Sequence, residues 1–275
     1  MSHNNQKKIA VINDISGFGR CSIAVSLPII SMLKVQCCPL PTSIFSNHTG
    51  FDSFFYEDFT PHMEQYIDEW EKLNLNFSGI CTGFLGSAQQ INIVTKFFQK
   101  FITKDTIVII DPVMGDYGKA YPTYTEEMCQ NMKNLIQYAN ILTPNLTEAC
   151  ILTDIPYKED WTFDEVAEIA RILSTKGPSK IVITGIIEGN NICNLCYEGD
   201  DNISIIKTQK IGTPRSGTGD IFSAIVAADA VNQVPLKESV QKAADFIKEC
   251  ILKSIEMDIP LTDGVCFEEV LHTLK

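Results

Sequence analysis

The sequence predicts a single α/β domain, residues 1–275, built on a doubly wound, mostly parallel central sheet flanked by helices. Short apolar runs alternate with helical patterns along nearly the whole chain. The runs lack polar–apolar alternation, which is typical of parallel strands buried on both faces. With 275 residues and 45% hydrophobic content the chain can bury one large core, so a second domain is not required.

The chain opens with a strand, a glycine-containing turn and a helix. The run Lys7–Asn13 predicts the strand, the turn follows at Ser16–Gly19, and an apolar helix extends from about Cys21 to Lys34. Four more apolar runs predict buried parallel strands: Ile80–Gly83, Thr106–Asp111, Asn140–Thr143 and Lys180–Gly185. Helix start signals lie between them. Ser87–Gln90 and Thr162–Glu165 match the capping box, and Thr60–Pro61 places proline in a first helical turn.

The final third of the chain changes in character. Ile192–Ile206 predicts two short strands around the turn Glu198–Asp201, which would form a small peripheral hairpin beside the main sheet. The chain then becomes mostly helical, and Leu236–Met257 combines an apolar face with a charged one.

Charge and hydropathy exclude several classes of partner. The formal net charge of −12 argues against nucleic-acid binding, which depends on clustered Lys and Arg. No apolar run approaches the roughly 18–20 residues that span a bilayer, and residues 1–8 lack the apolar middle of a signal peptide. Ten scattered cysteines fit reduced, buried thiols. We therefore expect a cytoplasmic protein that binds small molecules.

Polar side chains follow the predicted strands, where ligands bind in doubly wound sheets. Asp111 ends one strand and Asp116 follows it, Asn145 and Glu148 follow a second, and Thr184 lies in a third. Asp111, Asp116, Asn145 and Glu148 carry the hard oxygen ligands that Mg²⁺ prefers, and magnesium keeps much of its hydration shell. The alternative is that these residues are ordinary turn and helix-capping residues.

The turn Gly217–Asp220 directly precedes the apolar helical run Ile221–Ala228. The first N–H groups of a helix have no intrahelical partner, and glycines allow close approach, so such a turn predicts an anion site. Asp220 would repel a bound phosphoryl group unless it has a chemical role, such as accepting a proton from an attacking hydroxyl. Glycine-rich turns before helices can also be purely structural.

The glycine and strand-end motifs also fit two other classes of protein. Gly17 and Gly19 after the first strand suggest a dinucleotide-binding oxidoreductase, but Ser22 stands where that fingerprint needs Gly or Ala. A non-catalytic vitamin-binding protein would explain the strand-end turns, yet it gains nothing from an acid beside a phosphate site.

The order of motifs resembles the ribokinase-like superfamily of small-molecule kinases, and within it the pyridoxal/pyridoxamine kinases. The resemblance covers most of residues 8–255. It is carried by Phe45–Gly50, Thr82–Ser87, Asp111–Asp116, Thr143–Glu148 and Gly217–Asp220.

The resemblance implies ATP-dependent phosphorylation of the 5′-hydroxymethyl group of pyridoxal, pyridoxine or pyridoxamine, with Mg²⁺ as a cofactor and a homodimer as the usual assembly. It leaves open a monovalent cation and the preferred vitamer. Asp220 matches the family's general base, and the N–H groups of Gly217, Thr218 and Gly219 would stabilise the developing charge. By the same resemblance, Thr143 and Thr184 lie near the nucleotide phosphates.

Further residues take roles from the resemblance. Asp111, Asn145 and Glu148 match the Mg²⁺ and phosphate side, with Asp111 and Glu148 holding the metal largely through water. Residues 116–124 resemble a mobile flap over ATP, with Tyr121 as a cover, although a plain surface loop is the alternative.

The substrate side carries the departures from the pattern. Thr49 matches a residue that touches the pyridine ring, and Phe84, which replaces a frequent Tyr, retains stacking. Asp14 and Ser16 lie in a segment closer to hydroxymethylpyrimidine kinases, which are the alternative function. Either residue would contact the ring nitrogen or 3-hydroxyl, or would cap the next helix. Arg215 would stabilise the charge of a phosphate, or it would be a solvated arginine on the surface.

Overall fold

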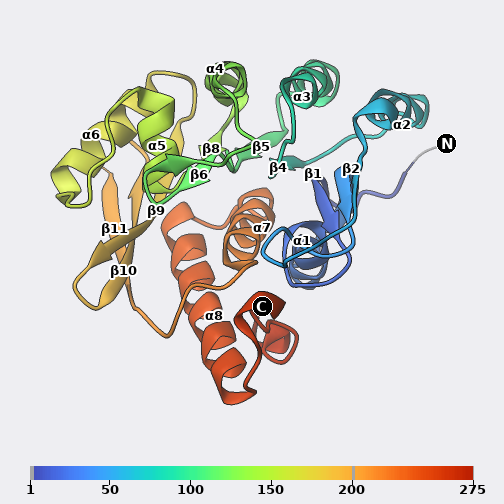
Figure 1. Ribbon diagram of the computed structural model, residues 1–275. Coiled ribbons are helices and arrows are strands. Elements are labelled where there is room, and N and C mark those ends of the chain that lie inside the picture. Colours follow the sequence, from blue (N-terminus) through green and yellow to red (C-terminus); the bar gives the residue numbers. More distant parts are fainter. Residues whose placement is uncertain (1–2, 200–201, 275) are drawn as a thin grey trace.

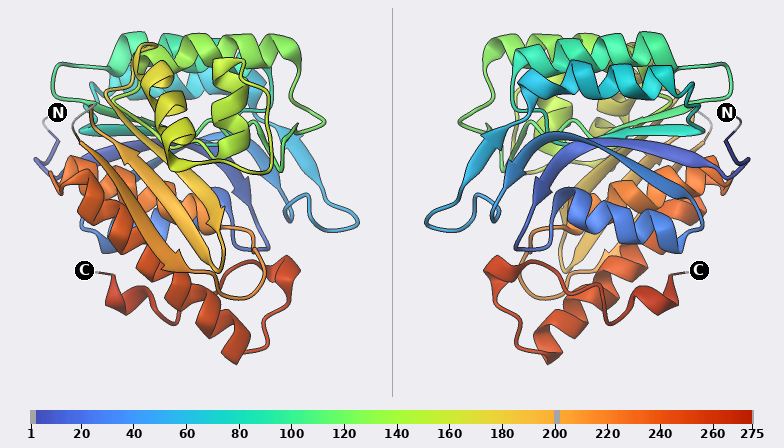
Figure 2. Two further views of the ribbon diagram at one scale, coloured as in Figure 1. Left: turned by 90° about the vertical axis from the view of Figure 1, so that its left-hand side faces the viewer. Right: turned by 90° about the vertical axis from the view of Figure 1, so that its right-hand side faces the viewer.

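The computed structural model describes residues 3–199 and 202–274. One nine-stranded sheet, in the order β11-β10-β9-β8-β5-β4-β1-β2-β3, lies between two layers of helices (Figures 1 and 2). The strands are β1 (Lys8–Ser16), β2 (Gln36–Phe45), β3 (Tyr56–Asp58), β4 (Gly79–Thr82), β5 (Ile107–Ile110), β8 (Ile141–Leu142), β9 (Lys180–Glu188), β10 (Asn191–Tyr197) and β11 (Ile203–Gln209). A separate two-stranded ribbon joins β6 (Gly115–Asp116) to β7 (Lys119–Ala120). The predicted doubly wound, mostly parallel fold is confirmed.

The helices divide between the two faces of the sheet. They are α1 (Ser22–Met32), α2 (Thr60–Lys72), α3 (Ala88–Phe101), α4 (Glu126–Leu135), α5 (Leu146–Thr153), α6 (Phe163–Ser174), α7 (Thr218–Val231) and α8 (Leu236–Glu256), with 3-10 turns at Ile136–Tyr138, Leu261–Asp263 and Leu271–Thr273. Helices α2 to α6 pack on one face, and α1, α7 and α8 on the other (Figure 1). Alternate residues of β1 enter opposite cores, Ala10 and Ile12 into one and Ile9 and Val11 into the other, which explains the continuous apolar run. Within the described residues, no helix is both long and apolar enough to cross a membrane.

Two helix start signals have different outcomes. Thr162 and Glu165 form both bonds of a capping box at α6. Ser87 accepts the N–H of Gln90, but the Gln90 side chain accepts from Gly86 instead of closing the box. The predicted second bond of the capping box at α3, from the Ser87 N–H to the Gln90 side chain, is therefore wrong. The Gln90 amide is instead directed toward β2, where it donates to the Thr42 carbonyl.

Two strand predictions need correction. The predicted hairpin of β10 and β11 forms at one end of the sheet, but it is continuous with the main sheet, because β10 also pairs antiparallel with β9. Part of the predicted turn, residues 200–201, lies outside the described residues. Strand β2 was missed because it contains Pro39 and Pro41, which argue against a central strand. Both prolines pair with β1, but β3 pairs with β2 only at residues 43–45. Among the described residues, no second strand therefore pairs with the proline stretch.

Candidate active site

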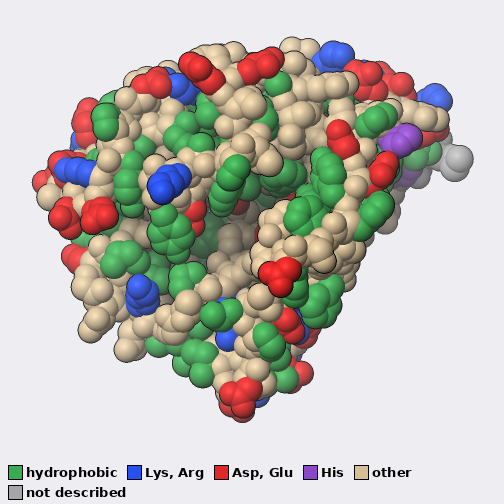
Figure 3. Space-filling view, viewed as in Figure 1, with side chains coloured by type: hydrophobic (Ala, Val, Ile, Leu, Met, Phe, Trp, Pro, Cys, Tyr) green, Lys and Arg blue, Asp and Glu red, His purple; other side chains and the backbone are tan. Residues whose placement is uncertain are grey.

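The carboxyl ends of the central strands meet at one edge of the sheet, together with the first turn of α7. Backbone hydrogen bonds align them: Asp111 N donates to Thr82 O at 3.2 Å, and Thr143 N donates to Ile110 O at 3.0 Å. Thr184 N donates to Pro144 O at 2.9 Å. The surface is hollowed in the middle of the face seen in Figure 3, with Asp and Glu side chains beside the hollow. This edge therefore gathers the predicted strand-end residues.

The turn before α7 is shaped for a ligand. Gly217 is the N-cap of the helix with φ +88°, and no side chain caps the helix there. A Cβ on Gly217 would lie 2.3 Å from the carbonyl oxygen of Arg20, whereas a Cβ on Gly219 would meet no heavy atom within 4 Å. The helix N-terminus therefore presents its partial positive charge beside open space, as an anion site requires.

Asp220 is held by the chain around it. Asn13 Nδ2 donates to Asp220 Oδ1 at 3.2 Å, and the Ser22 N–H also donates to this carboxylate. Asn13 is fixed in turn, because its Oδ1 accepts the N–H groups of Asp14 at 3.0 Å and Phe84 at 2.8 Å. Loss of contact with water raises the pKa of Asp220 despite these bonds. The result is an oriented carboxyl group whose affinity for a proton is enhanced.

Asp14 lies at the end of β1 beside Asp220. Ser22 Oγ donates to Asp14 Oδ1 at 2.6 Å and Ser16 Oγ donates to Asp14 Oδ2 at 3.2 Å. Burial, with a contribution from the Asp220 charge, raises the Asp14 pKa from 3.8 to about 6. The capping alternative for Asp14 and Ser16 is wrong, because Cys21 is the N-cap of α1 and no side chain caps this helix.

Replacing Asp14 with Asn should remove a pH-dependent loss of stability. An acid whose folded pKa lies above its unfolded value keeps its proton longer in the native state, so its stabilising contribution exists below pH 3.8 and is lost as pH rises through about 6. Asp14 should contribute a fall of up to about 3 kcal/mol to the wild-type free energy of unfolding across that window. Urea titrations from pH 4 to 8 measure it. An equal slope in Asp14→Asn would contradict this assignment.

The acidic side of the site joins Asp111, after β5, to Glu148 in α5. Ser223 Oγ donates to Asp111 Oδ2 at 2.6 Å, and the two Glu148 oxygens accept Met114 N at 2.9 Å and Asn145 N at 2.8 Å. Burial raises the pKa of both carboxyl groups, and the charge of a neighbouring acid raises each one further: Asp220 for Asp111, and Asp111 for Glu148. Asn145 and Glu148 also form the capping box of α5. These two residues therefore cap a helix, as the alternative interpretation predicts, and also lie at the acidic side of the site.

This donor set fits a hydrated magnesium ion. Its oxygens are hard ligands, and their crowded charges would be relieved by a divalent cation. The described residues contain no group of three or more His, Cys, Asp or Glu side chains arranged to hold a metal. Since both Glu148 oxygens already accept a backbone N–H, water would complete most of the coordination.

The β6–β7 ribbon covers this acidic side. Asn145 Nδ2 donates to Gly115 O at 2.8 Å, and Gly118 N donates to Thr147 Oγ1 at 2.9 Å, so α5 anchors the ribbon at two points. Tyr121 follows the ribbon and is 40% exposed. Burial, then the charges of Glu148, Asp116 and Asp111, raise its pKa to about 12. Asp116 and Tyr121 therefore lie beside Asp111 and Glu148, which is the position expected of residues that cover a bound nucleotide.

The remaining predicted site residues make no direct contact with these acids in the hydrogen bonds described above. Thr49 is exposed in the loop after β2, and Phe84 is partly buried, with its ring 6.4 Å from that of Phe45. Thr143 is buried directly after β8, and the backbone of Thr184 forms an isolated parallel β-bridge with that of Asn145. Arg215 donates to backbone carbonyls of the C-terminal segment.

Sequence reasoning missed three polar residues that hold the acids. Ser223 was detectable, because a residue three positions after Asp220 shares its helix face. Asn13 carried only a weak signal as a polar end to an apolar strand. Ser22 gave none, since its role depends on a backbone φ of +56° that no pattern predicts for serine.

The chain resembles known kinases along its length. A family model described as phosphomethylpyrimidine kinase matches residues 30–261. The pyridoxal kinase of Arabidopsis thaliana is 28% identical over 229 residues, which are 79% of this chain and 71% of that protein. A crystal structure of a candidate phosphomethylpyrimidine kinase from Bacteroides thetaiotaomicron is 37% identical, with a TM-score of 0.97 over 100% of this chain and 96% of that one. An orthorhombic crystal form of the same protein with pyridoxal is also 37% identical, with a TM-score of 0.94 over 98% of this chain and 96% of that one.

Proposed function

The chain belongs to the phosphomethylpyrimidine kinase family, and from that premise we propose that it phosphorylates the 5′-hydroxymethyl group of pyridoxal, pyridoxine or pyridoxamine with ATP. One observation carries the proposal: Asp220, oriented by Asn13, lies in the first turn of a helix whose N-terminus has no side-chain cap. The similarity to a pyridoxal kinase and to a structure with pyridoxal supports the substrate class.

The residues divide the reaction between them. Asp220 accepts the proton of the substrate hydroxyl. The hydroxyl oxygen then bonds to the γ-phosphorus of ATP as the bond between that phosphorus and ADP breaks. The N–H groups of Gly217, Thr218 and Gly219 bind the transferring group. Bound ATP would supply the phosphoryl group, and Mg²⁺ would neutralise part of its charge. Asp111 and Glu148 would hold the metal largely through water.

Nucleotide and vitamer take opposite sides of this centre. We assign Thr143, Asn145 and Thr184 to the nucleotide phosphates and Asp116 and Tyr121 to the cover. The ring contacts are assigned to the residues on the substrate side: Asp14, Ser16, Thr49 and Phe84.

A substrate panel tests the function. ADP release is measured with the three B6 vitamers and with hydroxymethylpyrimidine, at saturating ATP and Mg²⁺. We expect turnover with at least one vitamer, and phosphate on its 5′ oxygen by mass spectrometry and NMR. Binding of a vitamer without ADP release in any reaction would favour a vitamin-binding protein and end the kinase proposal.

Hydroxymethylpyrimidine kinase is the second candidate. The description of the matching family and of the Bacteroides thetaiotaomicron structure favours it, as does the segment around Asp14. It would prevail if hydroxymethylpyrimidine had the highest kcat/KM of the panel.

We also propose a homodimer that uses the exposed edge of the sheet. The edge strand β3 and the loop before it leave Phe54, Phe55 and Tyr56 between 43% and 62% exposed, and apolar patches beside an open strand edge favour association. Light scattering should give twice the chain mass of 30.7 kDa. Phe55→Asp should shift the protein toward monomer while its Tm stays close to the wild-type value. A monomeric wild type would refute the dimer.

A further inference from the structure

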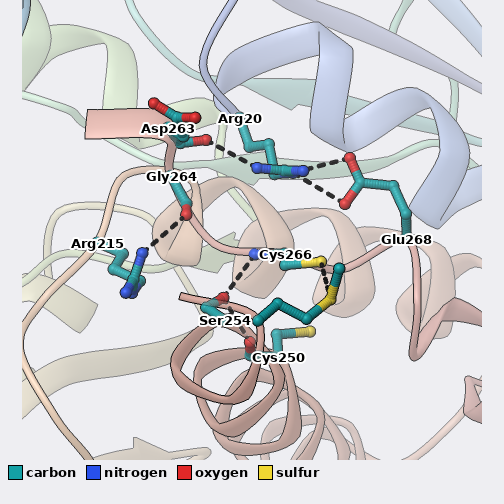
Figure 4. A network of polar contacts seen from close by, with 9 residues as sticks. Arg20, Arg215, Cys250, Ser254, Asp263, Gly264, Cys266 and Glu268 are labelled. Carbon is teal, nitrogen blue, oxygen red and sulfur yellow. Dashed lines mark hydrogen bonds and ion pairs between the residues drawn. The ribbon is translucent and has the colours of Figure 1, made fainter. Parts of the chain in front are cut away.

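The guanidinium of Arg215 contacts the segment after α8, and Figure 4 shows its contact with the Gly264 carbonyl. Its Nη1 donates to Ile259 O at 2.9 Å, Pro260 O at 3.0 Å and Gly264 O at 3.4 Å. We call residues 259–264 the carbonyl turn. Three carbonyl oxygens share one nitrogen, which has only two N–H bonds to give. The attraction is therefore in large part that of a cation for converging dipoles.

The same carbonyl turn receives donors from two other loops of the site. Arg20 donates to Asp263 O at 3.1 Å while its Nε contacts both Glu268 oxygens at 2.8 Å. His48 Nε2 lies 2.6 Å from Thr262 O, and His48 Nδ1 accepts the Gly50 N–H, so Nε2 carries the proton. Loops from three distant parts of the sequence thus meet on one short segment.

The carbonyl turn also directly supports the turn Gly217–Asp220 at the start of α7, which we call the anion turn. Val265 N donates to Ser216 O at 3.0 Å, and Thr218 Oγ1 donates to the Arg215 carbonyl at 3.2 Å. The Gly217 backbone passes against Arg20 O. A shift of the carbonyl turn would therefore move the N–H groups that face the phosphoryl group, and a displacement of about 1 Å costs on the order of 10² in rate.

We propose that Arg215 is a positioning residue whose guanidinium serves as a built-in monovalent cation: it offsets the partial negative charges of the carbonyl oxygens in the carbonyl turn and so fixes the anion turn. The inference rests on the proposed kinase function and concerns the same site. Backbone carbonyls that converge on a small volume are the ligands that K⁺ takes in proteins. Removal of the guanidinium should leave a site that K⁺ or free guanidinium can fill. The wild-type enzyme, with the site already filled, should not respond to either ion.

The test compares wild type, Arg215→Ala, Arg215→Lys and the control Arg171→Ala in Mg²⁺-containing buffers in which tetramethylammonium is the only monovalent cation, then with added KCl or low guanidinium chloride. We expect the kcat of Arg215→Ala to fall by about 10- to 100-fold, with a smaller change in KM for ATP. Added K⁺ or guanidinium should then raise the kcat of this variant by at least about tenfold. Arg215→Lys should retain more activity than Arg215→Ala. Wild type and Arg171→Ala should change by less than about twofold.

A second measurement is independent of catalysis. Without substrates, K⁺ or guanidinium should raise the Tm of Arg215→Ala relative to equal tetramethylammonium, and should not raise that of wild type. An Arg215→Ala that is folded by circular dichroism, and shows neither rescue nor this Tm shift, overturns the proposal. So does a large rise in KM for ATP without rescue, which would mark Arg215 as a phosphate ligand. A wild type inactive on every substrate would instead reject the kinase function and leave the Tm result standing.

Discussion

Replacement of Asp220 with Asn is expected to lower kcat by about 10²- to 10⁴-fold, with little change in ATP binding. The substitution keeps the size of the side chain and its place in the first turn of α7, so the anion turn should be preserved. It removes the group that takes the proton. Asn13 Nδ2 donates to Asp220 Oδ1, and the new side chain can still accept that bond through its amide oxygen.

Steady-state kinetics with the best vitamer, together with calorimetric titration of ATP, checks this expectation. Asp245→Asn provides a matched control, because Asp245 is an exposed acid on α8 whose side chain accepts a hydrogen bond from Gln241; its kcat should equal that of wild type. A kcat for Asp220→Asn within a few-fold of wild type would remove Asp220 from the role of general base, whatever its effect on stability.

The parts of this site that the sequence predicts are those that depend on local pattern. Parallel strands buried on both faces give continuous apolar runs, and the acid that follows such a run lies at the ligand-binding edge of the sheet. Asp111 and Glu148 were predicted in this way. Asp220 was predicted because its role follows from its position in the first turn of a helix after glycines.

The parts that the sequence does not predict depend on contacts between distant segments. Asn13 orients Asp220 across 207 positions of the chain, and its amide would satisfy many other partners equally well. Arg215 has a sequence position compatible with a phosphate contact, yet its carbonyl partners begin 44 positions later. For long polar side chains, the choice of partner is made by tertiary packing, and local pattern leaves several choices open.

Gly217→Ala should cause the other large loss, through conformation. Its φ of +88° belongs to the left-handed region, and the added Cβ would lie 2.3 Å from Arg20 O, a backbone atom that cannot rotate away. Relaxation must displace the anion turn or the loop after β1. We expect kcat/KM to fall by about 10²-fold or more and the free energy of unfolding to fall by about 1–3 kcal/mol. Kinetics and urea unfolding of the same preparation measure both.

Gly219→Ala separates conformation from space in the same turn. Gly219 has no φ in the left-handed region and no heavy atom within 4 Å of an added Cβ, so the fold should tolerate the methyl group. Stability should hold or rise by up to about 1 kcal/mol, because alanine favours helix over glycine. If a phosphoryl group approaches this backbone, the methyl group must still raise KM for ATP or lower kcat. Normal stability with impaired catalysis in Gly219→Ala would therefore place the ligand at this turn, whereas normal values of both would move it elsewhere.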